Sequence, residues 1–287
     1  MIHVSPKVLI ESSHLCANEL AERILASNGV KCTENLRLES DSSRPFNRNS
    51  YIAKGPWGRL ENCTKSILGF GVGNTFNTIG VARFSRELVD ELRSYCNNLG
   101  ETGALPIDGA PWRSILELIA TELAKSTRWT IGSVVPRSSF ACMQSGRSKN
   151  TARDEASNRY VGLHLDCFEE LAVQERWRGR NRFRINLGCS PRYLQFLTLP
   201  IGDMLNLLIE SGKAKKEITE WGKHSVMSNL VAREFMAVFP TTPVLRLEIM
   251  PGEAYIAPTE NLVHDGYVWS SMKDVTATFR CSVSINR

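Results

Sequence analysis

The sequence predicts a mainly β fold with flanking helices, carried by a single domain that spans residues 1–287. Eight short segments between residues 128 and 285 are rich in β-branched and aromatic residues, and Gly, Pro or Ser separates them. About eight short strands in one half of a chain are typical of a double-sheet jelly roll. Residues 1–127 instead carry apolar side chains at helical spacing, which predicts a mostly helical part, with loops, that packs on the outside of the sheets.

Helices are predicted from the spacing of apolar residues and from Ser, Asn or Gly at the ends of each segment. Three of them fall in the first part of the chain, over residues 13–26, 86–100 and 110–126. A helical insertion interrupts the strands over about 201–239. Between the first two helices, residues 31–64 are polar, and we expect a long surface loop or a lid there.

The composition is that of a folded protein without a strong electrostatic preference. Of 287 residues, 42% are hydrophobic and 23% are charged, which is close to the globular average and excludes gross disorder. The net charge of +5 suits small anionic ligands and does not require nucleic acid. The eight cysteines form no C-x-x-C pair, and no stretch approaches the roughly 20 apolar residues that span a bilayer. We therefore expect a cytoplasmic protein with reduced thiols and no membrane association.

A histidine and an aspartate stand two residues apart in the apolar segment 160–166. If this segment is a strand, His164 and Asp166 point to the same face, while Leu163 and Leu165 pack on the opposite side. Ionisable groups among apolar neighbours are costly unless they are paired or bind a metal. The pair therefore becomes a candidate metal site if a third ligand joins it.

Two later segments supply groups that complete such a site. His264 follows a predicted turn and strand about a hundred residues after the first histidine. Two histidines and one carboxylate fill one face of an octahedron and leave positions open for substrate and O₂, which suits Fe(II). On a late strand, Arg280 and Ser282 share a face, where a planar guanidinium and a hydroxyl can clamp a carboxylate.

This order of motifs, H-x-D, then a distal histidine, then R-x-S, resembles the Fe(II)/2-oxoglutarate-dependent oxygenase superfamily over roughly residues 128–285. The resemblance implies a double-stranded β-helix (jelly-roll, cupin-like) core with iron bound by His164, Asp166 and His264. Related halogenases have Gly or Ala in place of the carboxylate. The aspartate here favours hydroxylation, and desaturation or cyclisation by the same chemistry is left open.

The resemblance also implies a cosubstrate site. Arg280, helped by Ser282, would bind the distal carboxylate of 2-oxoglutarate, whose other end chelates the iron. O₂ would be consumed, with release of succinate and CO₂.

Five arginines alternate along residues 176–184, and an extended conformation would place them on one face. Such a face could contact nucleic acid, bind an acidic substrate at the mouth of the site, or be a solvated rim strand whose charge prevents edge pairing. Arg184 and Asn186 would share a face of the next strand, where either could contact the cosubstrate or the substrate.

The expected function is oxidation of a small metabolite, such as an amino acid or a biosynthetic intermediate, by a non-heme Fe(II)/2-oxoglutarate-dependent dioxygenase. A substrate that carries a carboxylate would suit the basic charge of the chain. Three alternatives remain. They are an iron oxygenase that acts on nucleic acid or protein through the arginine run, an iron oxidase that needs no keto acid and uses Arg280 to hold its substrate, and a non-catalytic jelly-roll binding module.

Overall fold

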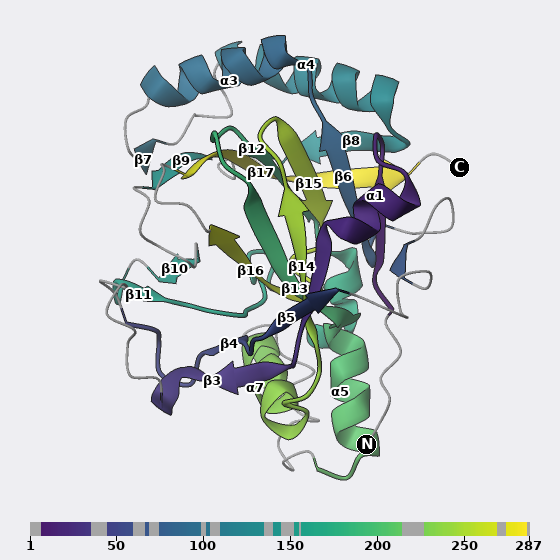
Figure 1. Cartoon of the computed structure of the whole chain (residues 1–287), viewed down its shortest axis with the longest axis vertical. Coiled ribbons are helices and arrows are strands. Elements are labelled where there is room, and N and C mark those ends of the chain that lie inside the picture. Colours follow the sequence, from purple (N-terminus) through teal and green to yellow (C-terminus); the bar gives the residue numbers. More distant parts are fainter. Residues whose placement is uncertain are drawn as a thin grey trace.

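Two large β-sheets pack against each other in the computed structural model (Figure 1), and apolar side chains from both fill the space between them. Helices cover the outer faces of the sheets at opposite ends of the molecule, with α3 and α4 at one end and α5 and α7 at the other. The structure describes residues 7–35, 45–59, 67–68, 75–98, 102–103, 110–134, 140–144, 152–154, 156–213, 227–268 and 274–285.

The larger sheet, sheet A, runs in the order β1-β6-β15-β12-β17-β9-β7, with β8 also paired to β17. Apart from β1 and β6, which are parallel, the paired strands of sheet A are antiparallel. Its strands are β1 (Leu9–Ser12), β6 (Thr78–Arg83), β7 (Thr102–Gly103), β8 (Trp129–Val134), β9 (Phe140–Gln144), β12 (Asn181–Asn186), β15 (Glu253–Ala257) and β17 (Asp274–Ile285).

The second sheet, sheet B, is antiparallel and runs in the order β16-β13-β14-β2-β5. A backbone bridge between His164 and His264 brings the segment around His164 to the outer edge of β16. The strands of sheet B are β2 (Ile24–Ser27), β5 (Trp57–Arg59), β13 (Arg192–Pro200), β14 (Val244–Ile249) and β16 (Leu262–Val268).

The path of the chain between these sheets is that of a jelly roll. It starts in sheet A with β9, passes the edge of sheet B near residue 164, and returns to sheet A with β12. It then forms β13 and β14 in sheet B, β15 in sheet A, β16 in sheet B and β17 in sheet A. This alternation winds the strands into a double-stranded β-helix. The predicted fold class, mainly β with flanking helices around such a core, is confirmed.

Alternation along β12 (Asn181–Asn186) separates an apolar outer face from a polar inner face. On β12, Phe183 and Ile185 are fully buried under α3 (Arg86–Asn98) and α4 (Ala110–Ser126). The arginines that alternate with them, at positions 182 and 184, therefore point to the other side, toward sheet B. On the far side of sheet B, α5 (Ile201–Glu210) and α7 (Ser228–Val238) cover Leu197 and Val263. These two helices lie in the predicted insertion.

The N-terminal part differs from its prediction as a mostly helical cover. Its strands β1 and β6 extend sheet A, and its strands β2 and β5 extend sheet B. The helix predicted over residues 13–26 is reduced to α1 (Ala17–Glu22), because Ile24 and Leu25 continue as β2 beside β14. Six residues form too few turns to be stable alone, and an available sheet edge satisfies the backbone better.

The segment 31–64, predicted as a long loop or lid, also contains regular structure where it is described. Strand β3 (Val30–Cys32) pairs with β4 (Tyr51–Ala53), a short 3₁₀ turn (Thr33–Asn35) follows β3, and β5 belongs to sheet B. Residues 36–44 and 60–64 lie outside the described residues. As for the membrane, none of the helices that the structure describes has both the length and the hydropathy needed to span one.

Candidate metal centre

The segment that carries His164 and Asp166 is not the strand that its alternating sequence predicts. The regular strand β11 (Arg159–Tyr160), paired with β10 (Arg153–Asp154), ends before it. The chain then turns at Gly162, whose φ of +74° lies in the left-handed region. A Cβ at Gly162 would lie 2.5 Å from the carbonyl oxygen of Tyr51, so this turn requires a glycine.

After this turn the chain runs alongside the segment that carries His264. The backbone N–H of His164 donates to the carbonyl oxygen of His264 at 3.0 Å, and the reciprocal bond is 2.8 Å long. The backbone N–H of Asp166 donates to the carbonyl oxygen of Thr259 at 3.1 Å. The two ligand-bearing segments, remote in sequence, are therefore tied together by their backbones.

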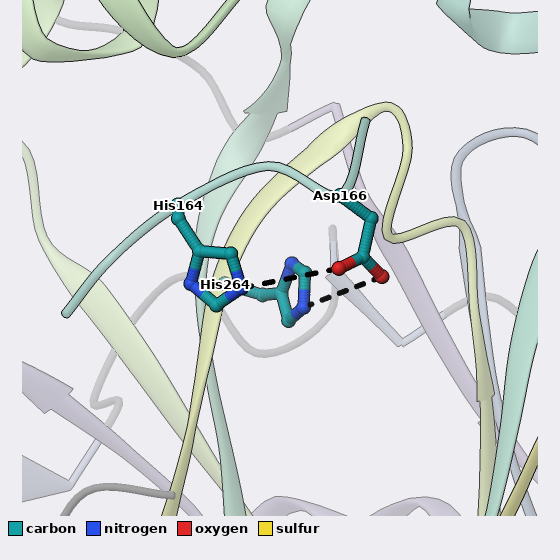
Figure 2. Close-up of side chains that lie close together, drawn as sticks. All are labelled: His164, Asp166 and His264. Carbon is teal, nitrogen blue, oxygen red and sulfur yellow. Dashed lines mark ion pairs between the residues drawn. The ribbon is translucent and has the colours of Figure 1, made fainter. Parts of the chain in front are cut away.

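The three side chains face a common point (Figure 2). His164 Nε2 lies 3.9 Å from Asp166 Oδ1, and His264 Nε2 lies 3.9 Å from Asp166 Oδ2. One candidate ligand atom from each residue can be chosen so that all three lie within 4.8 Å of one another. Asp166 and His264 are buried, and His164 is half-buried. The geometry therefore brings together the three residues that the sequence singled out.

The backbone determines which nitrogen of each imidazole is available. Nδ1 of His164 lies 2.7 Å from the carbonyl oxygen of Gly162, and Nδ1 of His264 lies 3.0 Å from that of Leu262. Because a carbonyl oxygen only accepts hydrogen bonds, both Nδ1 atoms carry the proton. Both Nε2 atoms then present a lone pair toward Asp166. Among the described residues, the buried Nε2 of His264 has no hydrogen-bond partner.

The electrostatic state of the three groups is also that of metal ligands. Burial lowers the pKa of His264 to about 3 and lowers the pKa of His164, so both imidazoles are neutral at pH 7. Burial opposes ionisation of Asp166, but the pKa of the carboxyl lies below its ordinary value, and the guanidinium of Arg182 is the largest influence that lowers it. The set is two neutral nitrogens and one carboxylate.

This donor set fits a divalent transition-metal ion. Imidazole and carboxylate ligands on one face of an octahedron are the set found at non-heme Fe(II). Adjacent ligands with bonds near 2.1 Å would lie about 3 Å apart, so the groups need to move inward by about 1 Å to bind an ion. The buried Nε2 of His264 would gain a bond that the protein itself does not supply.

Arg182, which the sequence analysis placed in the arginine run without a role of its own, touches the site directly. Its Nη2 lies 2.7 Å from Asp166 Oδ2. In the register of β12 and β17, Arg182 stands opposite Arg280, and both guanidinium groups lie over the ring of Phe168, with 5.7 Å and 4.3 Å from guanidinium carbon to ring centroid. The sequence did carry one indication that Arg182 lies near the site: it is expected on the same strand face as Arg184, which was a candidate for contact with the cosubstrate or the substrate.

Arg280 and Ser282 were predicted to form a carboxylate clamp, but their side chains have different surroundings. Arg280 is half-buried near the candidate ligands. Burial lowers the pKa of its guanidinium, and the nearby charges of Glu260, Glu169 and Asp166 oppose this effect. The hydroxyl of Ser282 lies 3.1 Å from that of Ser133 on β8. A register shift in β17 between residues 281 and 283 breaks the strict alternation on which the shared face was predicted.

Arg184 and Asn186 lie on the inner face of β12, as predicted. The Nε of Arg184 donates to the hydroxyl of Thr278 at 2.7 Å. The side-chain amide of Asn186 donates to the carbonyl oxygens of Ser190 and Ile249 and accepts from the backbone N–H of Gly188. Arg184 therefore borders the interior, while Asn186 closes the turn after β12.

The arginine run does not form the extended guanidinium face that its spacing predicts. Residues Val173–Arg178 form a short 3₁₀ helix, η2, and the extended conformation begins only with β12. The arginines bind groups of the chain itself: Arg176 pairs with Glu260, Arg178 with Glu175, Arg180 with Glu169 and Arg182 with Asp166, and Arg184 bonds Thr278. Their charge is thus directed largely inward, to carboxylates near the site.

No protein-family model matches the chain, and no curated protein matches it by sequence. Among solved structures it is similar to the Kdo hydroxylase KdoO, a non-heme Fe(II) alphaketoglutarate dependent dioxygenase. The apo structure of that enzyme is 14% identical with a TM-score of 0.37, over 71% of this chain and 79% of that chain. Its cobalt(II) complex is 14% identical with a TM-score of 0.35, over 71% and 80%. The complex with alphaketoglutarate and Fe(III) is 13% identical with a TM-score of 0.34, over 71% and 79%.

Proposed function

We propose that the protein is a non-heme Fe(II)- and 2-oxoglutarate-dependent oxygenase that hydroxylates, desaturates or cyclises a small molecule. The observation that carries this proposal is the convergence of one nitrogen from each of two imidazoles and one carboxylate oxygen within 4.8 Å of one another. A bound ferrous ion would supply the oxidising chemistry, in which O₂ and 2-oxoglutarate are converted to succinate and CO₂ while the substrate is oxidised.

His164, Asp166 and His264 are the proposed ligands, and their surroundings prepare them for a cation. Backbone carbonyl oxygens hold both imidazoles in the tautomer that aims Nε2 inward. Arg182 keeps Asp166 ionised and occupies one side of its carboxylate. The remaining directions around the metal position are left for cosubstrate and O₂.

Arg280 is our choice for the distal carboxylate of 2-oxoglutarate. It stands opposite Arg182, which contacts the proposed ligand Asp166, in the register of β12 and β17, so its guanidinium is close to the metal position. A planar guanidinium binds a carboxylate through two parallel hydrogen bonds. Ser282 is assigned a minor contribution, because its hydroxyl already contacts Ser133.

Arg184 is the competing position for the same carboxylate. It lies two residues from Arg182 on the inner face of β12, which is about 7 Å along the strand, and it is half-buried beside Thr278. The side-chain amide of Asn186 already donates to two carbonyl oxygens and accepts from one backbone N–H, which favours a structural role for that residue.

The substrate is expected to be a small molecule, and a carboxylate on it would suit the arginines at the site. The side chain of Phe168 is 55% exposed beside Arg280 and two residues from Asp166, so an apolar surface and a cation meet next to the proposed metal. The alternative of nucleic acid as substrate is less favoured, because the described ion pairs direct the arginine run toward carboxylates of the chain.

The decisive experiment is anaerobic addition of Fe(II) and then 2-oxoglutarate to the purified protein. A visible absorption band should appear with the wild type and be absent with Asp166→Ala. Arg280→Ala should weaken 2-oxoglutarate binding about 10- to 100-fold, the worth of a charged hydrogen-bonded pair, with Fe(II) binding nearly unchanged. Arg184→Ala is the matched variant, and a reversed result would transfer the carboxylate to Arg184. A protein that binds Fe(II) and oxidises substrate without releasing succinate would be a keto-acid-independent oxidase instead.

A further inference from the structure

A completely buried ion pair lies directly behind the proposed metal ligands. Arg176 lies in η2 and has no exposed surface. Its Nη1 lies 2.6 Å from Oε2 of Glu260, and the exposed fraction of Glu260 is 1%. Removing two full charges from water is costly, and an apolar pair of similar volume usually stabilises a fold at least as well. Stability alone therefore gives a poor reason for this pair.

The contacts of the pair point to another reason. The same Nη1 of Arg176 donates to the carbonyl oxygen of Asp166 at 2.7 Å, and the backbone N–H of Phe168 donates to Glu260 at 2.8 Å. The pair thus hydrogen-bonds to the backbone on both sides of Cys167, at the proposed ligand Asp166 and at Phe168. With the bond from the Asp166 N–H to the carbonyl oxygen of Thr259, these contacts connect residues 166–168 to residues 259–260.

Residues 259–260 lead directly into β16, which carries His264. The pair therefore spans the two chain segments that supply the proposed ligands. The packing around it is close, because a Cβ added to Gly179 would lie 2.6 Å from the Cβ of Glu260. A side chain at position 179 would displace Glu260, so the glycine is part of the same arrangement.

We propose that Arg176 and Glu260 are positioning residues that hold the backbone of Asp166 so that its carboxylate is aimed at the two imidazoles. This inference rests on the proposed metal centre. The three ligand groups come from an irregular segment and a strand edge, and a bridge of backbone hydrogen bonds alone leaves the rotation of the Asp166 peptide weakly constrained. The buried pair supplies a rigid, directional contact at that peptide.

The test is the double variant Arg176→Met/Glu260→Leu, which replaces the pair by apolar side chains. It should still fold, since it leaves no buried charge unpaired, with a melting temperature lowered only by the loss of the two backbone hydrogen bonds that the pair makes. Its affinity for Co(II) alone, used as the probe, should nevertheless fall about 10- to 100-fold, which is typical for residues that orient metal ligands. The visible absorption of bound Co(II) should change as well, because the carboxylate ligand is misdirected.

Arg128→Met/Glu11→Leu is the matched control, because it removes a 2.7 Å ion pair between the residue before β8 and strand β1. Its Co(II) affinity should equal that of the wild type. A second variant, Glu260→Gln, keeps one oxygen acceptor in place of the two that serve Arg176 and the Phe168 N–H separately, so its Co(II) affinity should fall less than that of the double variant. Arg176→Lys keeps the charge, but its nitrogen stands at the chain position of the guanidinium carbon, short of the two acceptors that Nη1 of Arg176 reaches. It should therefore bind Co(II) more weakly than Glu260→Gln does.

The outcomes separate the two proposals. If wild type and Asp166→Ala bind Co(II) equally, the metal centre itself is refuted. If Asp166→Ala loses Co(II) while the folded double variant keeps wild-type affinity and absorption, only the positioning role is refuted. Should the double variant not fold, equal Co(II) affinity and absorption in Arg176→Lys and the wild type would refute the positioning role in its place.

Discussion

Two buried carboxylates of this fold, Asp166 and Glu253, both face histidine and arginine side chains, yet they are arranged in opposite ways. Glu253, on β15, accepts hydrogen bonds from His14, from Arg23 and Arg83, and from the backbone N–H of Met250, at 2.8 to 2.9 Å. Its side chain has no exposed surface. Every strong acceptor direction of this carboxylate is used by the protein.

At Asp166 the two histidines lie too far from the carboxylate to form a hydrogen bond with it. Both Nε2–oxygen distances are 3.9 Å, which is beyond hydrogen-bond reach, whereas Nε2 of His14 lies 2.8 Å from Glu253. The residue types are nearly the same, so composition does not separate a structural cluster from a ligand cluster. The two clusters differ in their lone pairs. At Glu253 the carboxylate lone pairs accept hydrogen bonds from the protein, whereas at Asp166 the imidazole lone pairs point at a shared position that an ion could take.

Loss of one proposed ligand should produce the largest functional effect. His264→Ala should weaken Co(II) or Fe(II) binding by on the order of 100-fold or more, because one of three protein bonds to the ion is removed. Turnover should fall with it. Titration calorimetry with Co(II) measures the affinity, and Glu253→Gln serves as the control that changes a buried carboxylate without changing a ligand. Equal affinities for the His264→Ala variant and the wild type would show that the cluster is not a metal site.

The fold was predictable because its main signal is local. Strands such as β12, β14, β15 and β17 alternate or are strongly apolar, and the sequence between residues 128 and 285 shows them one by one. The N-terminal strands β1, β2, β5 and β6 were missed because they are short and take their stability from pairing with strands far away in sequence. Long-range pairing leaves no local periodicity to detect.

The clustering of His164, Asp166 and His264 was predictable because metal-binding chemistry restricts the residue types, and the spacing of two residues survives even without a regular strand. The surroundings of these residues were not. Arg176, Arg182 and Glu260 stand near the ligands only because η2 interrupts the arginine run and β12 pairs with β17. The alternation of arginines predicts a strand with all the guanidinium groups on one face. It does not tell whether that face contacts solvent or buried carboxylates. Only the pairing register distinguishes the two cases.

The Glu253 cluster should show the opposite profile to the ligands, with a large effect on stability and none on metal binding. Glu253→Gln should lower the free energy of unfolding by roughly 3 kcal/mol, because Arg23 loses a fully buried ionic partner. Denaturant unfolding of the metal-free protein measures this loss. Co(II) affinity should remain that of the wild type. A loss of Co(II) affinity in the folded variant would contradict the division between the two clusters.

The same cluster predicts a dependence of stability on pH. Burial opposes ionisation of Glu253, but its hydrogen bonds from His14, the Met250 N–H, Arg23 and Arg83 lower its pKa from 4.5 to about 2. The folded state therefore binds a proton less readily than the unfolded chain, and this stabilisation is complete above about pH 4.5. It is lost as the pH falls toward 2, by about 3 kcal/mol in total.

Unfolding curves at pH 7, 4 and 2.5 for wild type and Glu253→Gln test this sign. The stability gap between the two proteins should be widest at pH 7 and should narrow as the solution is acidified. A gap that stays constant over this range would mean that Glu253 titrates alike in the folded and unfolded states.

The smallest expected effect compares the two kinds of histidine. His14→Ala removes one of several hydrogen bonds to Glu253, and the arginines still neutralise the carboxylate, so the free energy of unfolding should fall by only about 1 kcal/mol. Metal affinity should not change, since Nε2 of His14 is already bonded within its own cluster. His164→Ala is the counterpart, and its Co(II) affinity should drop sharply. Nε2 of His164 lies 3.9 Å from Asp166, too far for a hydrogen bond, and is aimed at the proposed ion position. If the two variants weakened Co(II) binding equally, the contrast between a satisfied and a ligand-ready histidine would be lost.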